Sequence, residues 1–179
     1  MSRLAPLPMK EITDPELRDL ITRCEELGVP DPLFPRIIAR VPGQAKAVLR
    51  ALLMGHAEGS VDHRLKELMR IQLARFVEDP YFSELRSKRA QADGMTEDMV
   101  DSATDDYEDS ELFTVAEKIA LRYSDQLFLD ATKVDKFFYD EMRKHYSEPQ
   151  IMEIGSFVAL YHAIQLFMKT LDARPLAAA

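Results

Sequence analysis

The chain has 179 residues, enough for one domain with a buried core, and its 46% hydrophobic and 30% charged residues are ordinary for a globular protein. A formal net charge of −8 argues against a nucleic-acid partner, which would need a basic surface. No apolar run approaches the ~18 residues of a membrane span, no signal peptide is evident, and one cysteine, Cys24, excludes an internal disulfide framework. We therefore expect a cytoplasmic protein that does not bind membranes.

Capping residues and apolar periodicity predict helices in the first half of the chain. Thr13 and Glu16 form a capping box with Pro15 in the first turn, and Gly28 ends that helix. Apolar residues then recur at helical spacing. The predicted helices span about 13–27, 34–41, 44–57, 61–77 and 80–93.

The second half reads the same way. Thr96 and Thr132 are predicted helix caps, while Thr114 with Glu117 and Ser147 with Gln150 form further capping boxes. The last helix is apolar almost all round, which indicates burial on more than one side. The predicted helices span about 96–100, 114–128, 132–144 and 147–171. With no strand pattern, we predict an all-α helical bundle in a single domain 1–179, with an extended arm at 1–12 and a flexible tail at 172–179.

Charge is unevenly distributed. Residues 64–89 hold seven Lys or Arg against four acids, a local net charge of +3, whereas residues 101–111 hold six acids and no base. The acidic run is typical of a solvated loop between helices. The basic segment fits a solvated face and also a pocket that attracts a carboxylate.

The stretch 67–94 resembles the core of the alkylhydroperoxidase / carboxymuconolactone decarboxylase superfamily. In that pattern a Glu is followed twelve residues later by a C-x-x-C pair, then a His, a small residue and a Gly. Glu67 matches, and Tyr81, Ala90 and Gly94 match the aromatic, small and Gly positions. Asp79 and Phe82 stand at the two Cys positions, and Arg86 stands at the His position.

The resemblance implies an oligomeric helical bundle, most simply a homotrimer, with Glu67, Asp79, Phe82 and Arg86 facing a pocket. Peroxidase activity is not expected, because it needs an activated thiol and neither Cys position holds one. Cys24 lies on an apolar helix face, where a lone cysteine is usually a small core residue.

We assign catalytic roles to Glu67, Tyr81 and His162, with the pKa of Glu67 raised in an apolar pocket. We assign substrate binding to Arg64, Arg86, Arg89, Phe82 and Asp79, with Arg86 as a carboxylate clamp.

Each assignment has a structural alternative. Glu67 could pair with Arg64 or Arg70 on its own helix, and Asp79 could cap a helix that begins at Pro80. Tyr81 could serve simply as a packed side chain, and His162 could be a core histidine whose hydrogen bonds are satisfied. Arg86 and Arg89 could lie on the surface. Metal-ligand spacing and nucleotide motifs are absent from the sequence, so we expect neither a metal nor another cofactor.

These residues predict a cofactor-free acid–base enzyme for a small anionic organic acid. The leading hypothesis is an isomerase, acting cis–trans or on a double bond of an unsaturated dicarboxylate or oxo-acid such as an aromatic ring-cleavage product. One alternative is a decarboxylase for a carboxymuconolactone-like acid. The other is a non-catalytic oligomer that binds a ligand.

Overall fold

The computed structural model describes residues 2–174, and within this range the regular structure is entirely helical. The predicted all-α class is therefore confirmed. The helices are η1 Met9–Glu11, α1 Pro15–Glu26, α2 Phe34–Ile38, α3 Pro42–Leu52, η2 Leu53–Ala57, α4 His63–Phe76, α5 Lys88–Ala92, α6 Glu97–Asp105, α7 Val115–Leu129, η3 Ala131–Lys133, α8 Lys136–Met142 and α9 Glu148–Thr170.

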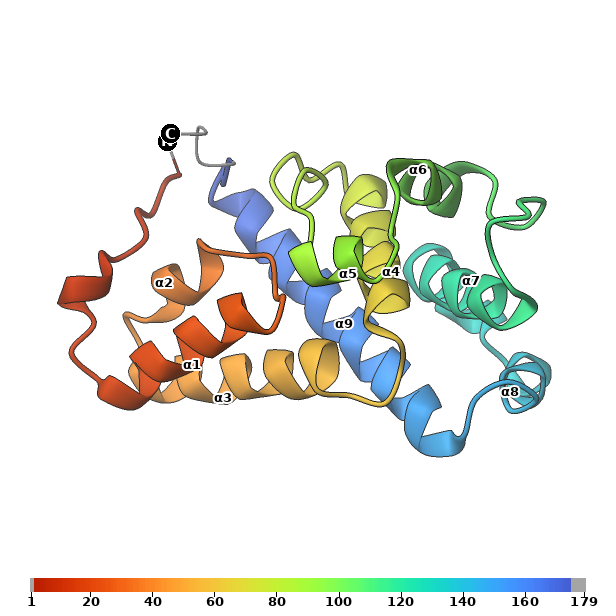
Figure 1. Cartoon of the computed structure of the whole chain (residues 1–179), viewed down its shortest axis with the longest axis horizontal. Helices are drawn as coiled ribbons and strands as arrows, with labels where there is room; N and C mark the ends of the chain where they lie inside the picture. The colour runs from red at the N-terminus through yellow and green to blue at the C-terminus, as the bar shows by residue number, and fades with distance from the viewer. Residues whose placement is uncertain (1, 175–179) are drawn as a thin grey trace.

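Helices α4 and α9 occupy the middle of the molecule (Figure 1). Helices α1, α2 and α3 lie on one side of this pair, and α6, α7 and α8 lie on the other. Helix α4 packs against α5, α6, α7 and α9, and eleven of its fourteen residues are buried. Side chains of α4 can therefore reach both halves of the molecule.

Helix α9 is long and apolar enough to cross a membrane if only its length and composition are considered. The core helix of a globular protein passes the same test. Here α9 packs against α4, α7 and η2, which gives it the place of a core helix. Three large apolar side chains on its outer face nevertheless remain exposed, at Met152, Leu166 and Phe167.

Several helix boundaries follow the predicted caps. Thr96 accepts the amide of Met99, and Thr114 with Glu117 forms the predicted capping box. Ser147 and Gln150 form the box that begins α9. Gly28 follows α1 with a φ of +93°, a left-handed conformation that glycine adopts without steric cost.

Two predicted caps are wrong. Asp14, and not Thr13, caps α1 by accepting the amide of Leu17, because the helix begins one residue later than predicted. The helix predicted over 132–144 is divided into η3 and α8. Asp130 caps the first piece by accepting the amide of Thr132, and Asp135 caps the second by accepting the amide of Phe138. Thr132 is therefore not the cap of either piece.

The helix predicted over 80–93 is also wrong. Residues 80–84 form turns, and only Lys88–Ala92 is helical. The carbonyl groups of Phe82, Ser83 and Leu85 accept hydrogen bonds from arginine side chains. These arginine contacts take the place of the backbone hydrogen bonds of the expected helix, so Asp79, Phe82 and Arg86 do not share one helical face.

The N-terminal arm lies beside the end of α9. The amide of Arg3 donates to the carbonyl of Leu171, and the Leu7 amide donates to that of Arg36, so the arm is fastened to the body. The arm predicted as extended contains the turn η1. Of the tail predicted over 172–179, Ala173 is buried, and residues 175–179 lie outside the described residues.

Candidate functional site

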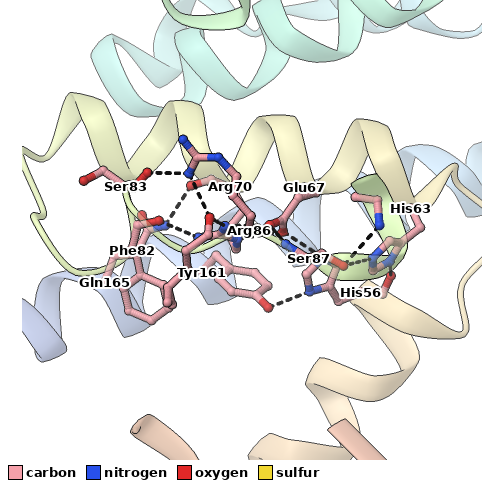
Figure 2. Close-up of polar contacts among 12 residues, drawn as sticks. His56, His63, Glu67, Arg70, Phe82, Ser83, Arg86, Ser87, Tyr161 and Gln165 are labelled. Carbon is pink, nitrogen blue, oxygen red and sulfur yellow. Dashed lines mark hydrogen bonds and ion pairs between the residues drawn. The ribbon is translucent and has the colours of Figure 1, made fainter. Parts of the chain in front are cut away.

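A buried ion pair forms the centre of the site. Arg70 donates from Nε to Oε2 of Glu67 at 2.8 Å and from Nη2 to Oε1 at 2.7 Å, and both side chains are 0% exposed. The two residues lie three apart on α4, which places them on one face of the helix. Of the two partners considered for Glu67 from the sequence, the structure selects Arg70 (Figure 2).

Arg70 also fastens the segment after α4. Its Nη1 donates to the carbonyl of Phe82 at 2.8 Å, and its Nη2 donates to that of Leu85 at 2.7 Å. Phe82 is 0% exposed, and the centroid of its ring lies 6.0 Å from Cζ of the Arg70 guanidinium. The position predicted to face a substrate is therefore filled by a packed ring.

The electrostatics of Glu67 differ from the expectation. Burial alone would raise the pKa of its carboxyl, but the charge and hydrogen bonds of Arg70, with a smaller effect of His56, hold that pKa below its ordinary value. The expected raised pKa is therefore wrong, because the pocket around Glu67 contains a buried cation. Glu67 is a permanently charged acceptor at neutral pH.

A histidine–serine pair lies beside Glu67. His63, the first residue of α4, has Nδ1 3.0 Å from the carbonyl oxygen of His56 and Nε2 2.8 Å from Oγ of Ser87. A carbonyl oxygen can only accept, so Nδ1 carries the proton and Nε2 accepts from the Ser87 hydroxyl. Burial lowers the pKa of His63, which favours the neutral imidazole.

His56 connects this pair to α9. Its Nδ1 lies 2.7 Å from the hydroxyl oxygen of Tyr161, and its Nε2 lies 3.4 Å from Oε2 of Glu67. Burial lowers the pKa of His56 to about 4 although Glu67 opposes the shift, so the ring is neutral at pH 7. The rings of His56 and His63 stack with their centroids 4.6 Å apart.

Ser87 links the network to a surface groove of about 370 Å³. Its amide donates to Oε1 of Glu67 at 2.8 Å, and the residue lines the groove. Arg86 and Lys88 line the groove on either side of it in the sequence. The other lining residues are Glu25, Gly28, Val29, Pro30 and Pro32.

Arg86 reaches the groove but is occupied. Its Nε and Nη2 each lie 2.9 Å from a carboxylate oxygen of Glu97, and its Nη1 donates to the carbonyl of Ser83 at 2.6 Å. Glu97 is well exposed, and the hydrogen bond from Arg86 lowers the pKa of its carboxyl. A substrate carboxylate would have to replace Glu97 at this guanidinium.

The structure does not gather the other predicted site residues around Glu67. Arg64 pairs with Glu117 of α7 at 2.6 Å, and Arg89 donates to the carbonyl of Ala57 at 2.8 Å. His162 packs against Phe128 with ring centroids 5.4 Å apart, while its neighbour Tyr161 is the residue that reaches the network.

Tyr81 and Asp79 have structural partners. Tyr81 donates its hydroxyl to the buried Asp31, and burial together with that carboxylate raises its pKa. Asp79 accepts the amides of Tyr81 at 2.7 Å and Phe82 at 3.0 Å, as a cap would, but these bonds close a turn and not the helix expected to begin at Pro80.

Sequence reasoning missed five members of the network: Arg70 as a buried residue, His56, His63, Ser87 and Tyr161. Metal-ligand spacing gives no signal at His56 or His63, which are seven residues apart in the sequence. These five residues come from η2, α4, the start of α5 and α9, so their proximity in space cannot be inferred from their positions along the chain. Within residues 2–174, no group of three or more His, Cys, Asp or Glu is arranged to hold a metal ion.

No model of a known protein family matches the sequence, and a search of curated proteins finds no match. Solved structures do match. The debrominase Bmp8, solved in complex with 2,3,4-tribromopyrrole, aligns with a TM-score of 0.80 at 20% identity over 97% of this chain and 91% of that chain. An AhpD-core peroxidase-related protein from Ralstonia eutropha gives 0.77 at 12% identity, over 97% and 93%.

A peroxidase-related protein from Silicibacter sp. aligns with a TM-score of 0.71 at 11% identity, again over 97% of this chain and 93% of that chain. The neighbours therefore share the whole architecture and little of the sequence. The chain has the fold of the alkylhydroperoxidase AhpD, as the resemblance in residues 67–94 predicted.

Proposed function

We propose that the chain is a cofactor-free acid–base enzyme that acts on a small anionic organic acid. The observation that carries this proposal is the 2.8 Å contact between His63 Nε2 and the Oγ of Ser87, which lines a groove together with Arg86 and Lys88. A neutral histidine with a bare nitrogen is a competent proton acceptor near pH 7. The two cations that line the groove, Arg86 and Lys88, favour an anionic substrate.

In this proposal the base is His63, in place of the Glu67 expected from the sequence. The Ser87 hydroxyl passes its proton to His63 Nε2 as it accepts one from the substrate, so the pair works as a relay. Glu67 is a positioning residue that holds the Ser87 amide at 2.8 Å. Developing enolate charge lies near the cations of Arg86 and Lys88.

Isomerisation of an unsaturated dicarboxylate or oxo-acid, such as a ring-cleavage product, remains the leading reaction. It requires only proton removal and return near one face of the substrate. Decarboxylation of a carboxymuconolactone-like acid is the alternative, but it requires the departing carboxylate to be free of an arginine. The fold does not choose between them, since its solved relatives include a debrominase and peroxidase-related proteins.

A ligand-binding role without catalysis is favoured by one observation. Ser87 is only 1% exposed, which suits a structural hydroxyl better than a freely accessible one. Peroxidase activity is not part of the proposal, because burial raises the pKa of the Cys24 thiol to about 12 and positions 79 and 82 lack sulfur.

Proton NMR in D2O tests the proposal. The protein is mixed with a panel of dienoate and muconolactone-type acids, with His63→Gln as the variant. Deuterium uptake or isomer interconversion that disappears in the variant supports acid–base catalysis, and the product identifies the reaction. Exchange that continues unchanged in a folded His63→Gln protein would remove His63 as the base. Ligand binding without turnover across the panel would favour the binding role.

We also propose that the chain assembles as a cytoplasmic homotrimer. The exposed apolar side chains of Met152, Leu166 and Phe167 on α9 support self-association, because exposed apolar surface of this kind is often covered in an oligomer. Light scattering after size-exclusion chromatography measures the mass. A monomer at micromolar concentration would contradict this part of the proposal.

A further inference from the structure

The geometry of Ser87 and His63 points to a further activity. Their Oγ and Nε2 atoms are 2.8 Å apart, within the 2.6–3.2 Å expected of a nucleophile and its general base. We propose that Ser87 is a nucleophile that accepts an acyl group from a carboxylate-bearing ester or lactone. This inference deepens the proposed function, because it rests on the same groove and names the class of substrate.

A third group orients the base, as nucleophilic catalysis requires. The carbonyl of His56 accepts the Nδ1 proton of His63 at 3.0 Å and leaves Nε2 bare. His56 is itself held by the Tyr161 hydroxyl at 2.7 Å and stacks on the His63 ring. The imidazole is therefore fixed in the tautomer that can remove the Ser87 proton.

The nucleophile is held by its own backbone. The Ser87 amide is bound to Glu67 at 2.8 Å, and the amide of Ala90 donates to Oγ at 3.3 Å. The Ala90 amide stabilises negative charge on Oγ, and the hydrogen bond to His63 aligns the proton for transfer. The Ser87 hydroxyl therefore accepts one hydrogen bond, from Ala90, and donates one, to His63, while its amide is held by Glu67.

The backbone of Gly28 lies close to the Ser87 hydroxyl and to the His63 ring. A Cβ at this position would lie 2.9 Å from Ser87 Oγ and 3.2 Å from His63 Nε2, closer than ordinary contacts allow. Gly28 and Ser87 both line the groove. A side chain at position 28 would therefore have to displace Ser87 or His63, so the Ser–His pair at the groove requires glycine there.

The charges in the groove select the acyl group. Arg86 and Lys88 precede and follow the nucleophile, and both line the groove. A substrate carboxylate would be attracted to these cations, and the oxyanion that forms at the attacked carbonyl would be stabilised by them. A dicarboxylic half-ester or a lactone with a free carboxylate has both features.

The step is balanced without a further reagent. Ser87 Oγ forms a bond to the carbonyl carbon, the carbonyl π electrons move to its oxygen, and His63 Nε2 takes the hydroxyl proton. As the tetrahedral intermediate collapses, the bond to the leaving alkoxide breaks and His63 returns the proton to it. Water then attacks the acyl-Ser87 ester in the same way, which releases the acid and restores the hydroxyl.

The test uses 4-nitrophenyl hydrogen succinate, an activated ester with a free carboxylate. The whole protein is expected to release a burst of 4-nitrophenolate close to one equivalent. Mass spectrometry of the digest should find the succinyl group on Ser87. The burst and the adduct should be lost in Ser87→Ala and in His63→Gln, which keeps the serine and removes the base.

Ser147→Ala is the matched control, because it makes the same change at the start of another helix, α9, and should keep the full burst. If Ser87→Ala does not fold, as judged by circular dichroism, His63→Gln decides. An absent burst in the folded wild-type protein, or an adduct on a lysine instead of Ser87, would overturn the inference. Deuterium exchange without acylation would sink only this inference, whereas acylation without exchange would sink only the proposed isomerase.

Discussion

Arg70 binds both carboxylate oxygens of Glu67 from three residues further along α4, and neither side chain is exposed to solvent. A buried carboxylate that loses its cation is left uncompensated at low dielectric. The pair therefore fixes the fold around the site as well as the site itself. The same guanidinium holds two carbonyl groups of the following segment.

Arg70→Met should lower the free energy of unfolding by about 3–5 kcal/mol, because it leaves the Glu67 charge buried without a partner. The double variant Glu67→Gln/Arg70→Met should lose less than the two single variants together, since a glutamine at position 67 is neutral and can still accept the Ser87 amide. Urea unfolding of the four proteins measures the coupling. A loss below about 1 kcal/mol in the single variant would contradict a fully buried pair.

Glu67→Gln alone should also be destabilising, because it leaves the Arg70 cation uncompensated. A loss of activity in this variant would therefore be accompanied by a loss of stability. The test of catalysis belongs at His63, whose partners are neutral groups.

Stability should fall as the pH is lowered from about 6.5 to 4. The pKa of His56 is about 4 in the folded protein and near 6.5 when unfolded, so the unfolded state binds more protons in this window. At ~1.4 kcal/mol per unit, the shift corresponds to roughly 3 kcal/mol. His63, whose pKa is also lowered, acts in the same direction.

Urea unfolding across pH 4–8 measures this dependence. His56→Gln should flatten the curve between pH 4 and 6.5, whereas His145→Gln, which changes an exposed histidine, should not. An unchanged slope in His56→Gln would show that this ring titrates normally. Loss of the paired Glu67 carboxylate follows at lower pH, because its pKa is lowered.

Arg86→Met should weaken the binding of a dicarboxylate such as maleate by roughly tenfold or more, since a hydrogen bond to a charged group contributes about 1.5–3 kcal/mol. Stability should change by less than about 1 kcal/mol, because the partner Glu97 is largely exposed. NMR titration gives the Kd. Arg122→Met, which removes the surface pair with Glu108, is the control, and equal Kd values in both variants would remove Arg86 from the binding site.

Comparing Gly28→Ala with Gly94→Ala separates the backbone strain of a positive φ from the steric clash of a new Cβ. Both glycines have a φ of +93°, so either change should cost about 1–2 kcal/mol of backbone strain. Only at Gly28 would the new Cβ also meet Ser87 Oγ and Arg89 Cβ, each at 2.9 Å. Thermal unfolding should therefore show a larger loss for Gly28→Ala, and anion binding should weaken in that variant alone.

Cys24 should not react with a thiol reagent in the folded protein. With a pKa of about 12, roughly one thiol in ten thousand is ionised at pH 8, and the side chain is buried. Absorbance of the released chromophore measures the reaction, and denatured protein provides the full signal. Rapid modification under native conditions would return attention to thiol chemistry.

The helical fold could be predicted from the sequence because capping residues and apolar spacing are local signals. The boxes at Thr114 and Ser147 show this, since each residue pairs with a partner three positions away. The segment after α4 could not be predicted in the same way. Its carbonyl groups are claimed by Arg70, which lies 12–15 residues earlier, and a tertiary contact of this kind overrides helical spacing.

In the site too, local features could be predicted from the sequence and tertiary contacts could not. Glu67 could be located from the resemblance, but its partner and the direction of its pKa depend on burial, which spacing does not measure. His56 and Ser87 are 31 residues apart and are connected only by tertiary contacts with His63 and Glu67. Arg86 could be placed at a groove, but the competing carboxylate of Glu97 comes from α6.

The π-turn η2 continues α3 and holds His56, with the amide of Glu58 bound to the carbonyl of Leu53 five residues earlier. Such a turn contains one residue more than an α-helix would use. Deleting one residue there would restore ordinary spacing and rotate the positions on one side of the deletion by about 100° relative to the other. A relative that is one residue shorter at this point could carry the same histidines and tyrosine and still lack these hydrogen bonds, so the length of this turn is itself a specification of the site.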